Sequence, residues 1–231
     1  MKTGSREVRR CRVGRNETIC TTEFDIVAVE RPVALVFNGI SHAVMLATPL
    51  DLEDFALGFA LSEGLLDRAE DCYGIEAHPT ADGVEVHLDI ASRAFARLKE
   101  QRRTLAGATG CGLCGMEQLG MLDLHPQRVT ARPALQAIAA PTMLKAAAAL
   151  PSHQPLNTSN GAMHAAAWVS PQGEIQGVGE DVGRHNALDK LIGRRLRARQ
   201  AGGQPAGLGD GFVLMSSRAS YELLRKCARL D

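Results

Sequence analysis

The chain has 231 residues, enough for one large domain or two small ones, and its 45% hydrophobic and 23% charged residues are typical of a globular protein. Its formal net charge is zero, so the total charge gives no reason to expect nucleic acid or a membrane as partner. No stretch approaches the roughly 20 apolar residues that cross a bilayer, and the N-terminus lacks the apolar core of a secretory signal. We therefore expect a cytoplasmic protein whose six cysteines are thiols.

The chain begins with a polar segment and a pair of strands. Residues 1–22 show no apolar periodicity, which predicts a flexible N-terminal arm. An alternating apolar run then starts near Val33, and Asn38-Gly39 separates it from a second apolar run. Asn-Gly between two such runs is the strongest short-range signal of a β-hairpin, so we predict one here.

The next elements complete a first unit. Asp51 can cap a helix that ends near Gly64. Residues 84–90 alternate strictly between apolar and polar side chains, which predicts a strand, and a helix is expected over 91–103. Together these elements predict an α+β subdomain over residues 23–104.

The second half predicts a larger unit. Residues 105–118 form a loop with two cysteines, and residues 119–231 alternate between helices and strands. In chain order we predict two short helices broken at Pro141, strands at 164–169 and 174–179, a helix over 183–199, a strand at 212–216 and a helix capped by Ser216 or Ser217. This order predicts a three-layer α/β domain with a mixed sheet.

Cys111 and Cys114 stand two residues apart in the glycine-rich stretch T-G-C-G-L-C-G. A four-cysteine zinc site needs a second such pair, and a zinc deaminase needs an H-x-E motif upstream; the sequence has neither. A thioredoxin-like pair needs a strand before it and a helix after it, whereas the glycines favour a mobile loop. A loop whose two thiols have no chemical role remains an alternative interpretation. An exposed thiolate that carries a sulfane sulfur fits the glycine-flanked loop better.

Polar residues crowd a predicted strand-to-helix turn that follows several glycines. The spacing of these glycines is not that of a dinucleotide-binding motif. One interpretation is structural, with Asp181 capping the helix and Arg184 pairing with it. The other is a polar pocket in which His185 transfers protons or binds a ligand. The candidate residues of this turn are Gly179, Glu180, Asp181, Arg184, His185 and Asn186.

Two further places could bind a ligand. Ser216, Ser217 and Arg218 lie where a predicted strand meets a helix, and two hydroxyls with a guanidinium suit a phosphate; a plain serine cap is the alternative. His164 begins a predicted strand. A lone histidine there is usually structural, but the neighbouring polar turns make it a candidate.

Three segments together resemble the hallmarks of one family, the formate dehydrogenase accessory sulfurtransferases, or FdhD family. They are TGCGLCG at 109–115, EDVGRHNALDKLIG at 180–193 and SSRASYEL at 216–223. A similar N-terminal segment extends the resemblance from about residue 23 to the end. The resemblance implies a cytidine deaminase-like domain without the deaminase zinc site, preceded by the smaller α+β unit.

The resemblance also implies a function. Such proteins accept sulfur from a cysteine desulfurase as a persulfide and pass it to the molybdenum cofactor, bis-molybdopterin guanine dinucleotide, before its insertion into formate dehydrogenase. Here Cys111 would carry the sulfur and Cys114 would assist. The alternative is a non-catalytic scaffold that holds the cofactor or the dehydrogenase without moving sulfur. A homodimer is expected, with no resident metal. Residues expected to contact the cofactor are His164, Gly179, Glu180, Asp181, Arg184, His185, Asn186, Ser216, Ser217 and Arg218.

The chain departs from the family pattern in two places. The usual T-G-G-x-H segment is replaced by Asn160-Gly161-Ala162-Met163-His164, which keeps the histidine. Family members also continue beyond the position of Asp231 with a strand, a helix and a Gly/Arg-rich loop. We therefore expect a C-terminally truncated domain with an exposed sheet edge and a weakened hold on the cofactor.

Overall fold

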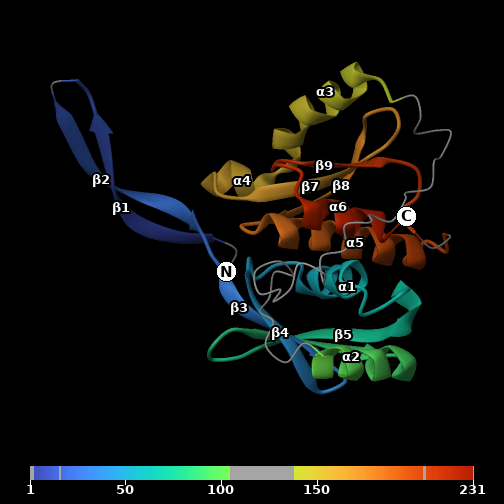
Figure 1. Ribbon diagram of the computed structural model, residues 1–231. Helices are drawn as coiled ribbons and strands as arrows, with labels where there is room; N and C mark the ends of the chain where they lie inside the picture. Colours follow the sequence, from blue (N-terminus) through green and yellow to red (C-terminus); the bar gives the residue numbers. More distant parts are fainter. Residues whose placement is uncertain (1–2, 16, 105–137, 205–206, 231) are drawn as a thin grey trace.

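The computed structural model describes residues 3–15, 17–104, 138–204 and 207–230. The predicted loop at 105–118 therefore lies outside the described residues. The N-terminal segment forms an antiparallel hairpin of β1 (Thr3–Val13) and β2 (Thr18–Ala28), which projects from the body of the molecule (Figure 1).

This hairpin corrects two expectations. We expect residues 1–22 to be irregular, but most of them belong to the two strands of this hairpin. Both faces of the hairpin are largely exposed, so its sequence lacks the alternation of apolar and polar residues that marks a half-buried strand. Cys11 and Cys20 were expected to be thiols, but they stand opposite each other in the hairpin and form a disulfide.

The first unit is a four-stranded sheet with two main helices. Its elements are β3 (Arg31–Phe37), β4 (Ile40–Ala47), α1 (Leu52–Ser62), a 3₁₀ turn at Ala69–Asp71, β5 (Cys72–Pro79), β6 (Val84–Ile90) and α2 (Ser92–Thr104). The strand order is β4-β3-β6-β5. Strand β3 runs parallel to β6 and antiparallel to β4, so the mixed sheet of the molecule lies here.

The second unit is a three-stranded sheet between helices. Its elements are α3 (Ala140–Ala149), a 3₁₀ turn at Leu150–His153, α4 (Pro155–Asn160), β7 (His164–Val169), β8 (Ile175–Asp181), α5 (Arg184–Ala201), β9 (Phe212–Met215) and α6 (Tyr221–Ala228). The order is β8-β7-β9, and both described pairs are antiparallel. The mixed sheet expected in this unit is therefore antiparallel among the described strands.

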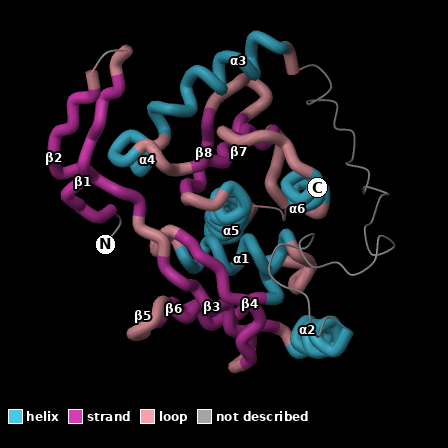
Figure 2. Tube along the Cα trace, turned by 60° about the vertical axis from the view of Figure 1, so that its left-hand side comes forward, coloured by secondary structure: helices cyan, strands magenta, loops and turns pink. Residues whose placement is uncertain are grey.

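Helices α1 and α5 lie between the two sheets and join the units (Figures 1 and 2). One continuous core includes Phe37 and Leu88 from the first sheet, Phe55 from α1, Leu188 from α5 and Trp168 from the second sheet. Helix α3 covers the opposite face of the second sheet with a smaller apolar cluster. Within the described part of the chain, no helix is long and apolar enough to cross a membrane.

Most predicted elements are confirmed, including the start of α1 after Asp51, and one helix start is corrected. Asn38 and Gly39 both adopt positive φ in the β3–β4 turn, as an Asn-Gly hairpin requires. Asp51 precedes α1 but has a left-handed backbone and makes no side-chain cap hydrogen bond. Helix α6 begins later than expected, with Ser220 rather than Ser216 or Ser217 as its N-cap residue.

Candidate functional site

Three of the predicted polar segments meet at one end of the three-stranded sheet. Strand β7 begins at His164 and is antiparallel to both neighbours, so β8 and β9 end beside its start. His164 pairs in register with Asp181. On the other side, the Ser216 N–H donates to the Ala165 carbonyl, and the Ala165 N–H donates to Ser216 Oγ, both at 2.9 Å. The β8–α5 turn, His164 and the segment after β9 therefore share one edge of the sheet.

Asp181 is the fully buried centre of this turn. Its Oδ1 accepts hydrogen bonds from the Gly183 N–H at 2.8 Å and from Asn186 Nδ2 at 3.1 Å. Its Oδ2 accepts from Lys190 Nζ at 2.7 Å and from the Thr48 N–H at 2.9 Å. The interpretation in which Asp181 caps the helix and pairs with Arg184 is wrong: Gly183 is the N-cap residue of α5, and Asp181 forms a buried ion pair with Lys190. Asp181 orders the turn and ties it to the first unit.

Lys190 and Asn186 extend this connection between the units. Lys190 Nζ donates to the Thr48 carbonyl at 2.9 Å, and Asn186 Nδ2 donates to the Leu46 carbonyl at 2.9 Å. Burial lowers the pKa of Lys190 below its ordinary value, and the neighbouring Asp181 opposes this effect. Of the predicted site residues, Asp181 and Asn186 thus position the turn from within.

Gly179 and Glu180 also have structural roles. A Cβ at Gly179 would collide with the backbone of Ala187 and Leu191, so this glycine permits close packing of β8 on α5. Glu180 is buried, and its carboxylate accepts hydrogen bonds from the Leu156 and Asn157 N–H groups at 3.1 and 2.9 Å. Glu180 therefore anchors the first turn of α4.

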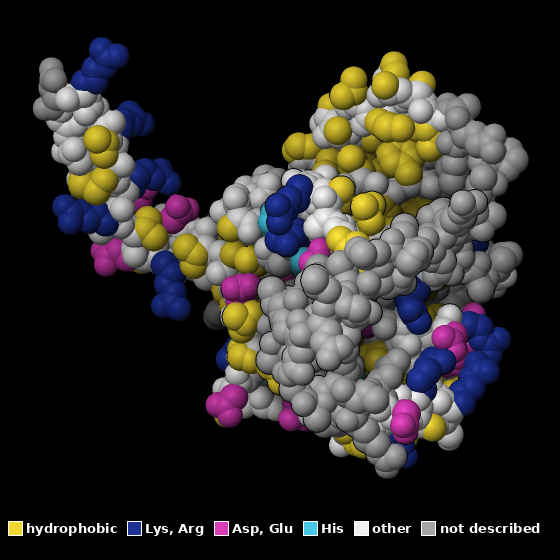
Figure 3. All heavy atoms as spheres, in the orientation of Figure 1, with side chains coloured by type: hydrophobic (Ala, Val, Ile, Leu, Met, Phe, Trp, Pro, Cys, Tyr) yellow, Lys and Arg dark blue, Asp and Glu magenta, His cyan; other side chains and the backbone are white. Residues whose placement is uncertain are grey.

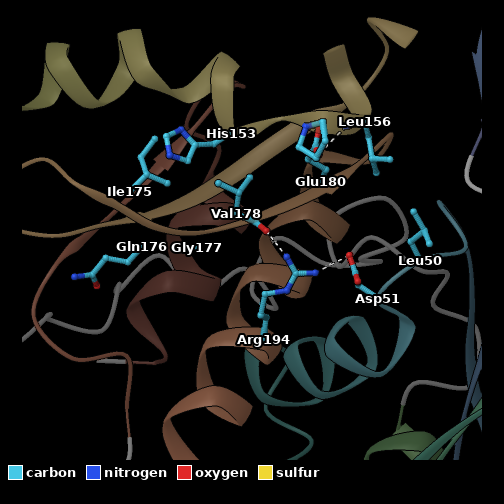
Figure 4. A pocket seen from close by; sticks show the side chains of 11 residues that line it. Leu50, Asp51, His153, Leu156, Ile175, Gln176, Gly177, Val178, Glu180 and Arg194 are labelled. Carbon is cyan, nitrogen blue, oxygen red and sulfur yellow. Dashed lines mark hydrogen bonds and ion pairs between the residues drawn. The ribbon is translucent and has the colours of Figure 1, made fainter. Parts of the chain in front are cut away.

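A cavity of about 400 Å³ lies beside the outer edge of β8, between α4 and the start of α1. Figure 4 shows Arg194 reaching into it from α5, with ion pairing to Asp51 at 2.6 Å and a hydrogen bond to the Val178 carbonyl at 2.7 Å. This guanidinium is already satisfied by protein groups. Glu180 is the one predicted cofactor-contacting residue among those that line this cavity.

Arg184 and His185 open α5 and are only partly exposed. Arg184 Nε and His185 Nε2 are both buried and have no hydrogen-bond partner within the described part of the chain. Such nitrogens usually find partners, so they mark a place where a ligand oxygen could bind. Ser217 is half-buried and Arg218 is exposed in the segment after β9, at the same edge of the sheet.

The environment of His185 favours the neutral ring. Burial is the main cause of its lowered pKa, and the positive charges of Arg184 and Lys226 add to it. Glu222 and Glu63 act in the opposite direction. At neutral pH, a neutral His185 beside a cationic Arg184 can accept one proton while the guanidinium holds an anion.

This lowered pKa predicts a pH effect on stability. The unfolded chain binds a proton at position 185 near pH 6.5, whereas the folded chain binds it only at lower pH. Stability should therefore fall as the pH drops below about 6.5, and His185→Gln should flatten that part of the profile. Urea unfolding between pH 7.5 and 5.5 measures this. The exposed His153→Gln serves as control, and equal profiles for both variants would contradict the assignment.

A second buried charge network was missed by sequence reasoning. Lys226 of α6 pairs with Asp189 of α5 at 2.9 Å and with Glu63 after α1 at 2.8 Å. Ser62 Oγ donates to Asp189 Oδ1 at 2.7 Å. The sequence carries no local signal of this network, because Asp189 lies off the apolar face that Leu188 and Leu191 predict for the helix, where a charged side chain is ordinarily exposed.

The cysteines of the described residues differ from the predicted carrier. Burial raises the pKa of Cys72 and of Cys227 to about 11, so both are protonated at neutral pH. Cys111 and Cys114 lie outside the described residues. Among the residues that are described, no group of three or more histidine, cysteine or acidic side chains could hold a metal ion.

Comparison with known proteins gives consistent results. The sequence model described as the FdhD/NarQ family matches residues 28–231. The chain is 54% identical to the "Sulfur carrier protein FdhD" of Burkholderia cenocepacia, over 90% of this chain and 74% of that protein. It is 57% identical to the protein of the same name from Chromobacterium violaceum, with the same coverages.

The fold has a solved counterpart. The structure matches the crystal structure of a candidate formate dehydrogenase accessory protein from Desulfotalea psychrophila with a TM-score of 0.66 and 20% identity. The match covers 98% of this chain and 80% of that one. At this identity the likeness establishes the α+β fold.

Proposed function

Because the chain belongs to the FdhD/NarQ family, we propose that it is a sulfur carrier that supports formate dehydrogenase. The names of its relatives support the sulfur-carrier role. The observation that carries the proposal further is the meeting of the β8–α5 turn, His164 and the segment after β9 at one edge of the sheet. A carrier needs such a place to hold the acceptor near its sulfur.

The finer proposal assigns the sulfur to Cys111. Its thiolate would attack the sulfane sulfur of a persulfide on a cysteine desulfurase. A new S–S bond forms on Cys111, the donor S–S bond breaks, and the donor cysteine leaves as a thiolate. The raised pKa values of Cys72 and Cys227 support this choice, since neither supplies a thiolate at neutral pH. Cys114 would assist, by resolving or shielding the persulfide.

The acceptor proposed for this sulfur is the molybdenum cofactor in its bis-guanine-dinucleotide form, bound as a substrate. Its phosphates are anionic, and their oxygens suit Arg184 Nε and His185 Nε2, which have no hydrogen-bond partner among the described residues. Ser217 and Arg218 add a hydroxyl and a guanidinium from the segment after β9. His164 stands between the two segments. We also propose that two copies of this chain form a homodimer.

Mass spectrometry after incubation with a desulfurase and cysteine tests the assignment. We expect an adduct of about 32 Da, the mass of one sulfur atom, on the wild-type chain and its loss in Cys111→Ala. Cys227→Ala is the matched control, since it removes a protonated cysteine, and should keep the adduct. An adduct that survives in Cys111→Ala would exclude Cys111 as the carrier.

A further inference from the structure

The Cys11–Cys20 disulfide lies near the tip of the β1–β2 hairpin, where solvent reaches it. Both cysteines are exposed, and the last strand pair before the turn, Val13 with Thr18, follows just beyond them. In Figure 3 the hairpin stands clear of the body of the molecule. A disulfide is broken by a thiolate that attacks one of its sulfurs, so exposure admits the attacking molecule. The Cys11–Cys20 pair therefore has the access that reduction requires.

The charge around the disulfide favours attack by a thiolate. Every charged residue between positions 9 and 15 is an arginine, and the facing residues 18–22 carry no charge. Arg10 is engaged by Glu23 at 2.7 Å, whereas Arg9 and Arg12 stand opposite the uncharged Thr22 and Ile19. Positive charge attracts the anionic attacker and stabilises the cysteine thiolate that leaves.

The order of the hairpin depends on this disulfide, because the strands gain little from hydrophobic burial. The large apolar side chains Val13, Ile19 and Phe24 are 77%, 54% and 77% exposed. The hairpin meets the body near its base, where β2 passes α4 (Figures 1 and 2). An isolated two-stranded hairpin is marginally stable in water. A disulfide that closes a short loop shifts the folding equilibrium of that loop on the order of a hundredfold, which is enough to decide between an ordered and an open hairpin.

The register of the hairpin favours a dithiol as the reductant. Cys11 and Cys20 stand directly opposite each other. After a monothiol attacks one sulfur, the thiolate of the other cysteine therefore remains beside the mixed disulfide. It attacks that bond and restores the original disulfide, because two groups held together react at a high effective concentration. A dithiol avoids this reversal, since its own second thiol is also held beside the mixed disulfide and completes the reduction.

We propose that Cys11–Cys20 is a reversible redox site, which a dithiol reduces and which switches the hairpin between an ordered and an open state. One thiolate of the reductant bonds to Sγ of one cysteine, and the S–S bond of the pair breaks with release of the other cysteine as a thiolate. The second thiol of the reductant then forms the reductant's own disulfide and releases the first cysteine. Two electrons and two protons pass from the dithiol to the cysteine pair. By linkage, the ordered hairpin stabilises the disulfide by the same factor as the disulfide stabilises the hairpin.

Reduction of the full-length chain by thioredoxin, kept reduced by its reductase and NADPH, tests this inference, with glutathione as the monothiol in a parallel sample. Free thiols are alkylated, and peptide mass spectrometry scores Cys11 and Cys20. Limited digestion with trypsin reports the order of the hairpin, because cleavage after Arg9 or Arg12 follows the population of the open state. We expect thioredoxin to reduce the pair and glutathione to leave most of it oxidised. Reduction should speed this cleavage by at least about tenfold.

Two variants and one internal site serve as controls. Cys11→Ser/Cys20→Ser cannot form the disulfide, so its hairpin should be cleaved at the faster rate with and without thioredoxin. Cys72→Ala/Cys227→Ala removes two cysteines that the structure leaves as thiols, and it should keep the response of the wild type. Cleavage after Arg97 in α2 reports on the body of the protein and should not change.

The inference is overturned by a pair that thioredoxin leaves oxidised, by a pair that glutathione reduces as completely, or by equal cleavage of the hairpin in oxidised and reduced chains. Faster cleavage after Arg97 as well would also contradict it, because reduction would then loosen the whole chain. The sulfur adduct on Cys111 plays no part in these measurements, so their outcome does not depend on the proposed function.

Discussion

Replacing Asp181 by Asn should lower the free energy of unfolding by about 3–5 kcal/mol, the usual cost of removing one partner of a buried ion pair. Lys190 has no exposed surface, and Asp181 is its partner at 2.7 Å. Without the carboxylate, the ammonium would remain buried with only carbonyl oxygens, of Thr48 and Glu180, as acceptors. Desolvation of an uncompensated charge costs far more than a lost neutral hydrogen bond.

Two comparisons isolate this effect in urea unfolding. Asp67→Asn removes an exposed ion pair with Arg97 at 2.8 Å, and it should cost less than about 1 kcal/mol. Asp181→Asn/Lys190→Met removes both buried charges, and it should recover part of the loss. If Asp181→Asn were no more costly than Asp67→Asn, or if the double variant were worse than the single one, the buried pair would not be the cause.

The sequence predicts the special turn that contains Asp181 but not the partners of its carboxylate. The crowd of polar residues after a predicted strand indicated a special turn, and the structure does bring this turn to the end of the sheet. The partners of Asp181 could not be predicted. Thr48 lies 133 residues away along the chain, and local periodicity carries no information about such contacts. Lys190 lies within the next helix, where a lysine is ordinarily exposed.

Periodicity succeeded where one face of an element is buried. The strand at Val84–Ile90 and the helix from Arg184 match their predictions, because each packs an apolar face on the common core. It failed where that condition is absent: the short helix α4 has no buried residue, and the strands of the N-terminal hairpin are largely exposed. Strand β5 (Cys72–Pro79) was not predicted either, although its Ile75 and Ala77 are partly buried against the core.

Cysteine chemistry was also only partly accessible from the sequence. The nine-residue separation of Cys11 and Cys20 does not indicate a pair until the register of the hairpin places them opposite each other. The domain limits and the contacts of the cofactor remain predictions. The structure adds that Gly179, Glu180, Asp181 and Asn186 make contacts within the protein, so Arg184 and His185 are the stronger candidates of that turn for contacting a ligand.

The glycines where α1 crosses α5 predict a second large effect on stability. A Cβ at Gly58 would fall on the backbone carbonyl of Asp189, and a Cβ at Gly193 would fall on that of Asp54. Neither backbone can rotate away as a side chain could. Gly58→Ala would gain about 1 kcal/mol of helix propensity. The clash should outweigh this gain and leave a net loss of about 2 kcal/mol or more, since overpacking a tight core costs about 1–3 kcal/mol and sometimes more.

Separation of these helices would also stretch the ion pairs around them. Asp189 binds Lys226, and Asp54 binds Arg197 at 2.7 Å, so a shift of either backbone displaces a charged partner. Gly177→Ala is the control, because the nearest atom to its added Cβ is Leu191 Cδ1 at 3.9 Å, and its stability should change by less than about 1 kcal/mol. Thermal and urea unfolding of both variants measure this difference in stability. A Gly58→Ala chain as stable as the Gly177→Ala chain would show that α1 and α5 can separate without cost, contrary to the packing at their crossing.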